Sequence, residues 1–339
     1  MSALAAAPSR DFVDLRDWGA GAAIDLADLA LQLKRRPPRS RPLEGRSVGL
    51  CFMNPSLRTQ TSFQVASASL GAHPVTLHFG NGTWNMEWRD GTVMDGQASE
   101  HLKESVPVLA RYCDVLALRA FPAGTSWADD KADPWLNAFR SSSRVPVISL
   151  ESAMGHPCQG LADLMTLREK ADPVGKRFVL AWAPHIKALP LAVPHSAAQA
   201  AVIAGMDLTI CRPEGYDLDP GVMEWCRAEA ARQGRSVTVT DSPETAFDGA
   251  HVVYAKAWGS LASYGVPPPQ DSAFRDRWRM TAAKMAKTKA GLFMHCLPVR
   301  RNLVVDDAVL DGPASVVIDQ AENRLHTAKA LLLKLLGGL

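Results

Sequence analysis

Residues 48–61, VGLCFMNPSLRTQT, predict a buried strand that leads directly into a helix. The first six residues are apolar and β-rich, and Asn54-Pro55 marks the turn that ends them. Similar runs recur along the chain and alternate with helical patterns, at residues 74–79, 115–118, 145–150, 178–183, 207–211, 237–240, 251–255, 292–295 and 316–318. Strands that alternate with helices form parallel sheets covered on both faces, so the expected fold class is α/β.

The length of 339 residues suggests two domains. We expect two doubly wound parallel-sheet domains, residues 1–155 and 156–319, divided near Glu151–Pro157. Helices are expected at residues 61–70, 100–112, 159–169 and 220–233. Two interdomain helices would join the halves: the one at 159–169, and a last helix at 320–336 that returns residues 320–339 to the first domain. The stretch 182–194, WAPHIKALPLAVP, is rich in proline and is expected to be a stiff loop.

The composition excludes several classes of protein. With 47% hydrophobic residues, the chain can form two buried cores. Its net charge of +2 gives no excess of basic residues that would indicate binding to nucleic acid or to an anionic membrane. The N-terminus, MSALAAAPSRDF, lacks the basic start of a signal peptide. The six cysteines are scattered, which indicates reduced thiols rather than disulfides or zinc. We therefore expect a cytoplasmic protein.

The turn after the first strand has the residue types of a phosphate site. A helix that begins there would point free backbone N–H groups at a ligand. Ser56, Thr59 and Thr61 add hydroxyls, and Arg58 adds a guanidinium suited to phosphate. A Ser/Thr helix cap beside a surface arginine would explain the same residues. The sequence has no glycine-rich Walker loop, which disfavours nucleotide binding.

Three further segments place polar residues at the carboxyl ends of expected strands. Arg119 ends one strand, His156-Pro157-Cys158-Gln159 follows another, and His295-Cys296-Leu297-Pro298 follows a third. Open parallel sheets bind ligands at this edge. Taken singly, His156 could be a structural histidine and Cys296 a buried thiol. Their shared position favours one site.

These motifs resemble those of the aspartate and ornithine carbamoyltransferase family. Its Ser-x-Arg-Thr-x-Thr motif for carbamoyl phosphate matches residues 56–61, its His-Pro-x-Gln matches 156–159, and the His-Cys-Leu-Pro of its ornithine branch matches 295–298. The resemblance implies a homotrimer with shared active sites that transfers the carbamoyl group of carbamoyl phosphate in arginine biosynthesis. A hydride-transfer enzyme would need a G-x-G-x-x-G after a strand, which the sequence lacks. A non-catalytic ligand-binding protein of the same fold is the remote alternative.

Position 256 separates this chain from the ordinary ornithine enzymes of the family. Those enzymes carry Asp-x-x-x-Ser-Met-Gly, whose aspartate holds the ornithine α-ammonium, and here Lys256 replaces the aspartate. A lysine would repel a free α-ammonium and attract a carboxylate. With Trp84 ahead of GTVMDG (91–96) and His185 in the loop 182–194, the chain resembles the N-acetylornithine and N-succinylornithine carbamoyltransferase branch. In that branch the loop forms part of a knot in the second domain.

The resemblance also implies roles for single residues. Carbamoyl phosphate would be bound by Ser56, Leu57, Arg58, Thr59, Arg119, His156, Gln159, Cys296, Leu297 and Arg324, and by Trp84 of a neighbouring subunit. The expected catalytic residues are Arg58, Thr59, Arg119, His156 and Cys296. The acyl-ornithine would be held by Ser99, Glu151, His185, Lys256 and Arg300. No metal or organic cofactor is expected.

Ser99 favours a succinyl rather than an acetyl group on the ornithine. In the family the acetyl type carries glutamate at the matching position, and the succinyl type carries proline. Serine lacks the charge that would repel the distal carboxylate of a succinyl group. Val304, where the acetyl type has lysine, and the Glu151-to-His156 spacing point the same way. Ser99 could instead be only the cap of the helix expected at 100–112, and N-acetylornithine is the alternative substrate.

Overall fold

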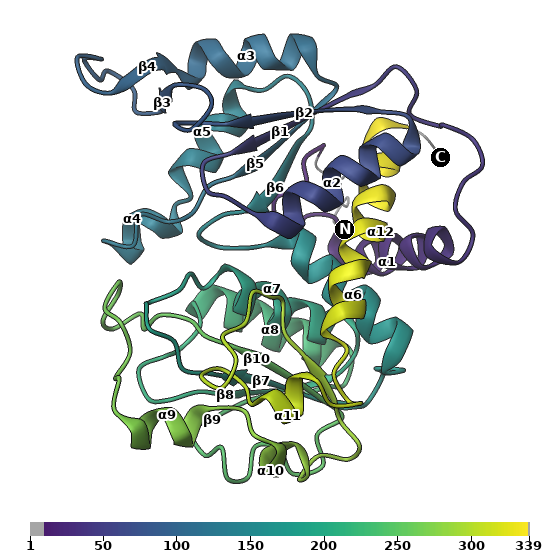
Figure 1. Cartoon of the computed structure of the whole chain (residues 1–339), viewed down its shortest axis with the longest axis vertical. Helices are drawn as coiled ribbons and strands as arrows, with labels where there is room; N and C mark the ends of the chain where they lie inside the picture. Colours follow the sequence, from purple (N-terminus) through teal and green to yellow (C-terminus); the bar gives the residue numbers. More distant parts are fainter. Residues whose placement is uncertain (1–9, 338–339) are drawn as a thin grey trace, which may run out of the picture.

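The computed structural model describes residues 10–337 and confirms the α/β class (Figure 1). Two parallel sheets lie one above the other in this view. The upper sheet has the order β2-β1-β5-β6, formed by β1 (Ser47–Phe52), β2 (His73–His78), β5 (Val115–Arg119) and β6 (Val147–Glu151). The lower sheet has the order β11-β10-β7-β8-β9, formed by β7 (Arg177–Trp182), β8 (Asp207–Cys211), β9 (Val237–Thr240), β10 (Val252–Lys256) and β11 (Leu292–Met294).

The order of the strands determines where each sheet has a crevice at the carboxyl ends of its strands. In the lower sheet the chain starts at β7, runs outward through β8 and β9, and then returns to β10 on the other side of β7. Strands β7 and β10 are paired in parallel from Phe178–Val252 to Trp182–Lys256. Connections leave these two strands in opposite directions, so a crevice forms beyond their carboxyl ends. In the upper sheet the corresponding reversal lies between β1 and β5.

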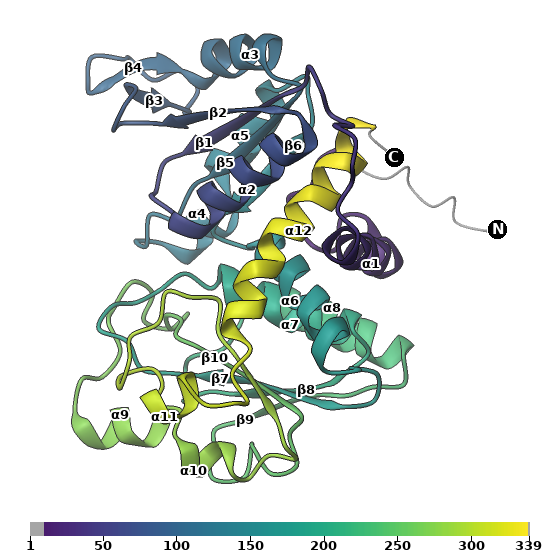
Figure 2. The ribbon, with the colours of Figure 1, turned by 45° about the vertical axis from the view of Figure 1, so that its right-hand side comes forward.

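Four helices pack together along one side of both sheets: α1 (Gly19–Arg35), α2 (Leu57–Leu70), α6 (Pro157–Lys170) and α12 (Val317–Leu336). Figure 2 shows α12 running obliquely from the lower half towards the upper half. Its Ala330, Leu331 and Leu332 are buried in the same core cluster as Leu161 of α6. Burial of such apolar side chains is the main term that holds the helices in place.

The remaining elements are short or cover single sheets. They are α3 (Leu102–Tyr112), α4 (Trp127–Lys131), α5 (Pro134–Ser142), α7 (Ala192–Ile203), α8 (Pro220–Arg232), α9 (Ser272–Trp278), α10 (Ala282–Met285), α11 (Asp307–Leu310) and the parallel pair β3 (Asn85–Glu87) and β4 (Ala98–His101). Helix α4 belongs to the upper half but contacts the lower one. Asp130 accepts a hydrogen bond from the Tyr264 hydroxyl at 2.9 Å, and Lys131 pairs with Asp219 at 2.7 Å.

The structure corrects three local expectations. Residues 316–318 are not a strand: Ser315 makes one isolated bridge to Phe293, and the chain then enters α12 at Val317. Valine and isoleucine there mimic a strand, but Val317 is buried and Ile318 exposed within a helical turn. The loop 182–194 ends earlier than expected, because Ala192–Pro194 form the first turn of α7, where a proline costs no hydrogen bond.

Ser99 is not a helix cap. It lies within β4, and the helix expected from residue 100 begins at Leu102, capped by His101, whose side chain accepts from the Lys103 N–H. The expectations about residues 1–9 and 338–339 lie outside the described residues.

The six cysteines are free and buried. Between residues 10 and 337, no helix is long and apolar enough to cross a membrane. Over the same range, no three His, Cys, Asp or Glu side chains are grouped so as to hold a metal ion.

Gly49, in the middle of β1, has no room for a side chain. A Cβ there would lie 2.6 Å from Leu116 Cδ2 and 3.2 Å from Cys113 Sγ. We expect Gly49→Ala to lower the free energy of unfolding by about 1–3 kcal/mol through overpacking. Gly21→Ala in α1 is the matched control, since its Cβ would meet nothing within 4 Å and alanine favours a helix. Urea denaturation compares them; equal midpoints for Gly49→Ala and the wild type would contradict the expected crowding.

Candidate active site

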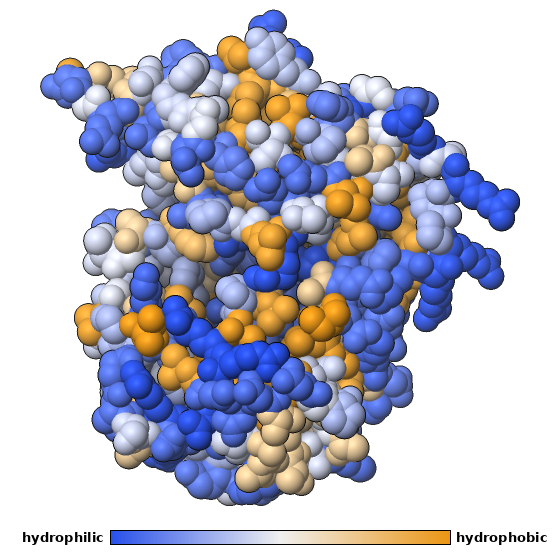
Figure 3. Space-filling model, in the orientation of Figure 1, coloured by the Kyte–Doolittle hydropathy of each residue, from blue (hydrophilic) through white to orange (hydrophobic). Residues whose placement is uncertain are grey.

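A cavity of about 630 Å³ opens between the two halves, at the carboxyl ends of the strands. Its walls come from the turn after β1, the ends of β5, β6 and β10, and the starts of α2 and α6. The segments 185–193 and 295–304 and α12 complete them. In the space-filling view the surface is hollowed along the boundary between the halves (Figure 3). Fourteen of the sixteen residues expected in the site line this cavity: Ser56, Leu57, Arg58, Thr59, Arg119, Glu151, His156, Gln159, His185, Lys256, Cys296, Leu297, Arg300 and Arg324.

The first helix turn after β1 forms one wall. Ser56 caps α2, and its hydroxyl accepts from the Thr59 N–H at 3.2 Å. The cap interpretation of Ser56 is therefore correct, and it is compatible with a ligand because other N–H groups of the turn stay unpaired by the helix itself. Arg58 is half-buried, and burial lowers the pKa of its guanidinium, with a further lowering from Arg119.

The Thr59 hydroxyl holds two arginines. Arg324 Nη2 donates to Thr59 Oγ1 at 2.6 Å, and Arg119 Nη1 donates to the same oxygen at 3.4 Å. A hydroxyl has two acceptor lone pairs and one donor hydrogen. Both lone pairs are taken, so the Thr59 hydrogen is left to point into the cavity that Thr59 lines.

Positive charge dominates the walls. Six lining residues are Lys or Arg and one is a carboxylate, Glu151. Arg119 Nη2 lies 3.1 Å from Glu151 Oε2, and both side chains are nearly inaccessible. Burial raises the pKa of Glu151, while Arg119, Lys256 and Arg324 oppose that rise. The excess of partly desolvated cations suits a ligand with several negative charges.

His156 is a neutral hydrogen-bond donor. It caps α6, and its Nδ1 accepts from the Gln159 N–H at 3.3 Å. The proton of the neutral ring therefore sits on Nε2, which faces Glu151 Oε2 at 3.7 Å. Burial lowers the pKa of His156 well below its usual value, and Arg324, Arg119 and Lys256 lower it further. A ring in this state can polarise an oxygen but is a poor base.

The segment after β11 presents its backbone to the cavity. His295 N donates to Gln320 Oε1 at 3.0 Å, and Leu297 N donates to His295 Nδ1 at 2.9 Å. Leu297 adopts φ 55°, in the left-handed region. With its N–H bound, Leu297 offers only its carbonyl to a ligand. Burial raises the pKa of the Cys296 thiol, and Lys256 opposes that shift.

The loop after β7 forms the outer wall. Arg300 Nε donates to His185 Nε2 at 3.2 Å, and Gln270 Nε2 donates to the His185 carbonyl at 3.0 Å. The wall also contains residues that the sequence did not single out, namely Phe121, Lys187, Leu189, Pro190 and Val193. The proline-rich character of this loop was the available signal for four of them, whereas nothing in the sequence marked Phe121.

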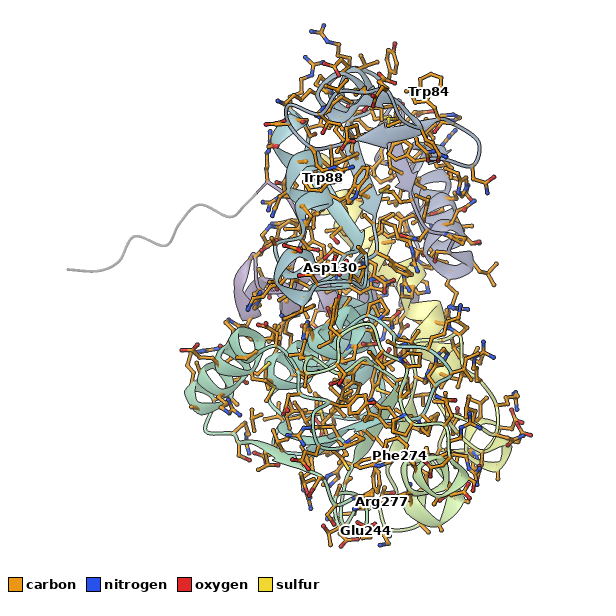
Figure 4. All side chains as sticks on the ribbon, turned by 90° about the vertical axis from the view of Figure 1, so that its left-hand side faces the viewer. Trp84, Trp88, Asp130, Glu244, Phe274 and Arg277 are labelled. Carbon is orange, nitrogen blue, oxygen red and sulfur yellow. The ribbon has the colours of Figure 1, made fainter. Side chains whose placement is uncertain are left out.

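Trp84 and Ser99 lie outside the cavity of their own chain. Trp84 is 55% exposed, and its Nε1 donates to Glu100 Oε2 at 2.7 Å. Ser99 is exposed on β4. Figure 4 shows Trp84 near the top of the upper half, whereas Asp130 lies near the junction of the halves.

Comparisons with known proteins agree with this geometry. Residues 10–169 match the model of the carbamoyl-P binding domain of aspartate/ornithine carbamoyltransferase, and residues 191–335 match that of its Asp/Orn binding domain. The chain is 42% identical to the N-acetylornithine carbamoyltransferase of Xanthomonas campestris pv. campestris, over 97% of this chain and 98% of that protein. It is 37% identical to the N-succinylornithine carbamoyltransferase of Bacteroides thetaiotaomicron, over 87% and 88%.

Solved structures give the same answer. An acetylornithine transcarbamylase complexed with acetylcitrulline superposes with a TM-score of 0.91 at 41% identity, covering 96% of this chain and 98% of the other. The chain belongs to the aspartate/ornithine carbamoyltransferase family, in the branch that contains the N-acetylornithine and N-succinylornithine enzymes.

Proposed function

We propose that this protein transfers the carbamoyl group of carbamoyl phosphate to the δ-amine of an N-acylornithine. The observation that carries the proposal is the cavity itself, which is lined by a capped helix start, six cationic side chains and a single carboxylate. Carbamoyl phosphate is an anion and an N-acylornithine carries at least one carboxylate, and helix N-termini with arginines suit phosphate. The product would be an N-acylcitrulline, with phosphate leaving.

Carbamoyl phosphate would enter first. Its phosphate would lie on the Ser56–Thr59 turn, paired with Arg58 and Arg119. The carbamoyl oxygen would accept hydrogen bonds from Arg119, the Thr59 hydroxyl and His156 Nε2. The available hydrogen on Thr59 and the neutral state of His156 support these roles. Such donors stabilise the negative charge that develops on the oxygen in the transition state.

The acceptor amine would attack the carbamoyl carbon directly. A new C–N bond forms, the C–O bond to phosphate breaks, and the amine proton passes to the departing phosphate. Cys296, held as a thiol by burial, would position the amine. Gln159 and the Leu297 carbonyl would hold the carbamoyl NH2. Fixing both reactants in line supplies much of the acceleration.

Lys256 supports an acylated rather than a free ornithine. It lies at the end of β10 and lines the cavity, together with His185 and Arg300. A free α-ammonium there would face cations, and like charges in a partly desolvated site are unfavourable. An acylated nitrogen carries no charge, and the α-carboxylate could pair with these residues.

We further propose that the preferred acyl group is succinyl. Ser99 supports it, because serine lacks the negative charge that the acetyl type carries there and that would repel the distal carboxylate. Val304, buried in the cavity wall, is a second departure from the acetyl type. One relative has been solved as a glutamate-to-serine variant with carbamyl phosphate and N-succinyl-L-norvaline. The alternative, N-acetylornithine, is favoured by overall similarity, because the N-acetylornithine relative is 42% identical and the N-succinylornithine relative 37%.

The proposed assembly is a cytoplasmic homotrimer with shared sites. Trp84 (55% exposed) and Val93 (78%) are large exposed hydrophobic residues on the β3–β4 excursion, a pattern typical of an interface. A neighbour's Trp84 and Ser99 would then complete the cavity. We propose domains at 1–155 and 156–319, joined by α6 and α12. The second would be knotted near loop 182–194, where Gly259 N donates to Leu189 O.

Replacing Arg58 should abolish most carbamoyl phosphate use. We expect Arg58→Ala to lower kcat/KM for carbamoyl phosphate about 10–100-fold, the effect of losing a hydrogen bond to a charged group, about 1.5–3 kcal/mol. Steady-state phosphate release measures it. Arg39→Ala, at an exposed arginine that does not line the cavity, is the control. An Arg58→Ala enzyme with wild-type kcat/KM would remove Arg58 from the site.

Trp84 should act on a neighbouring subunit's site. We expect Trp84→Ala and Arg58→Ala each to keep only a small fraction of wild-type activity alone. After subunit exchange at equal concentrations, the mixture should recover about a quarter of wild-type activity, the fraction of sites that draw both intact residues from different subunits. Activity is measured before and after exchange. Mixed trimers that stay inactive would show that the site is not shared through Trp84.

The acyl preference should follow the charge at position 99. We expect kcat/KM to be about tenfold higher for N-succinylornithine than for N-acetylornithine, and very low for free ornithine, and Ser99→Glu should shift the ratio towards acetyl. Ser99→Ala, which adds no charge, is the matched control and should keep the preference. Equal or higher kcat/KM for N-acetylornithine in the wild type would make the alternative substrate correct. Robust turnover of free ornithine would refute the acylornithine proposal.

A further inference from the structure

Asp163 is a buried carboxylate with no part in the proposed chemistry. It lies one helical turn after Gln159 on α6 and is 1% exposed. Its Oδ1 accepts from Gln159 Nε2 at 2.8 Å and from Gln320 Nε2, on α12, at 2.6 Å. Burying a carboxylate is costly unless hydrogen bonds satisfy it. An apolar side chain would join α6 to α12 without that cost, so the carboxylate calls for another explanation.

We infer that Asp163 is a positioning residue that fixes the orientation of the Gln159 and Gln320 amides, so that Gln159 turns its oxygen towards the carbamoyl group. This inference deepens the proposed function and rests on it. An ionised carboxylate can only accept hydrogen bonds, whereas an amide has one accepting and one donating end. Both glutamines must therefore turn their NH2 groups towards Asp163 and their oxygens away from it.

For Gln159 the consequence is direct. Its Oε1 accepts from Arg324 Nη1 at 2.8 Å and is left with one lone pair, while Gln159 itself lines the cavity. That lone pair is an acceptor for the carbamoyl NH2, a group that can only donate. A flipped amide would turn its single NH2 towards both the carbamoyl NH2 and the Arg324 guanidinium, and donors facing donors could form no hydrogen bond.

For Gln320 the consequence is one step removed. Its Oε1 accepts from His295 N at 3.0 Å, and His295 Nδ1 accepts from Leu297 N at 2.9 Å. This chain of bonds leaves the Leu297 carbonyl as the group that the segment offers to the cavity. Asp163 thus sets Gln159 Oε1 as one acceptor for the carbamoyl NH2. Through Gln320 it also anchors the His295 backbone, two residues before the Leu297 carbonyl that the proposed function assigns as the other acceptor.

The surroundings of Asp163 permit the ionised state near neutral pH. Burial raises its pKa to about 6, while the bonds from Gln159 and Gln320 and the nearby Tyr254 and Arg324 oppose the rise. Tyr254, on β10, faces both Asp163 and Cys296. Burial raises the pKa of its hydroxyl, and these two neighbours raise the pKa further. The tyrosine therefore stays protonated and does not compete for the proton of Asp163.

The test separates recognition of the amide from recognition of the phosphate. Phosphonoacetamide keeps both the anion and the NH2 of carbamoyl phosphate, whereas methylphosphonate keeps only the anion. Calorimetric titration of the folded enzyme gives both dissociation constants. We expect Asp163→Leu to raise the dissociation constant of phosphonoacetamide about tenfold or more, the size of one lost hydrogen bond. The dissociation constant of methylphosphonate should stay within about twofold of the wild-type value.

Thr166→Val is the matched control. Thr166 lies on the same face of α6 and accepts from Asn323 of α12 at 2.9 Å, so the variant also loses a buried bond between the two helices. It does not touch Gln159, and its ligand selectivity should equal that of the wild type. Asp163→Asn, which keeps an accepting oxygen, should recover most of the selectivity. The inference would be overturned if Asp163→Leu weakened the binding of both ligands equally, or the binding of neither.

A reciprocal exchange keeps the test decisive if Asp163→Leu does not fold. Gln159→Glu alone sets two carboxylates against each other and should lose phosphonoacetamide binding. Combined with Asp163→Asn, the glutamate gains a donor and still accepts from the ligand, so selectivity should return. A double variant no better than Gln159→Glu alone contradicts the inference. A wild-type enzyme that prefers neither ligand and releases no phosphate from carbamoyl phosphate with acylornithines would instead refute the proposed function.

Discussion

The site depends on holding two buried guanidiniums side by side. Arg119 comes from β5 of the upper sheet and Arg324 from α12, and both donate to the Thr59 hydroxyl. Like charges repel, so this arrangement needs anions close by. Glu151 pairs with Arg119, and the Gln159 side-chain oxygen accepts a hydrogen bond from Arg324. A ligand with several negative charges would complete the neutralisation, so the charge of the cavity favours anions before any substrate-specific contact is made.

The same pair of arginines explains the course of the chain. Thr59 opens α2, Arg119 ends β5, and Arg324 lies on a helix that begins beside the lower sheet. Bringing them together requires α12 to cross from one half to the other, packed between α1, α2 and α6 (Figure 2). The helix interface is therefore part of the site, since the side chains that join α6 to α12 include Asp163, Gln159 and Gln320.

The sequence predicted the fold class and most cavity-lining residues, because both depend on local patterns. Apolar runs indicate strands, and parallel strands bring their carboxyl ends to a common edge, so Ser56, Arg119, His156 and Cys296 could be assigned to one place. The strand expected at 316–318 was wrong because Val317 and Ile318 are compatible with either element over so few residues. The place of Phe121 in the cavity wall depends on long-range packing, and no local pattern indicated it. The roles of Trp84 and Ser99 depend on a neighbouring subunit and stay predictions.

The position of α12 also has a consequence for biosynthesis of the protein. Both sheets are complete by Met294, but Gln320 and Arg324 lie in the last helix of the described chain. During synthesis the upper sheet can form while the lower one is still emerging, since domains generally fold as units from the N-terminal side. Until α12 docks, Thr59 and Gln159 lack the guanidinium that joins them. The assembled site is thus a late event, and a nascent chain can form the strands of both sheets before it can bind its substrates.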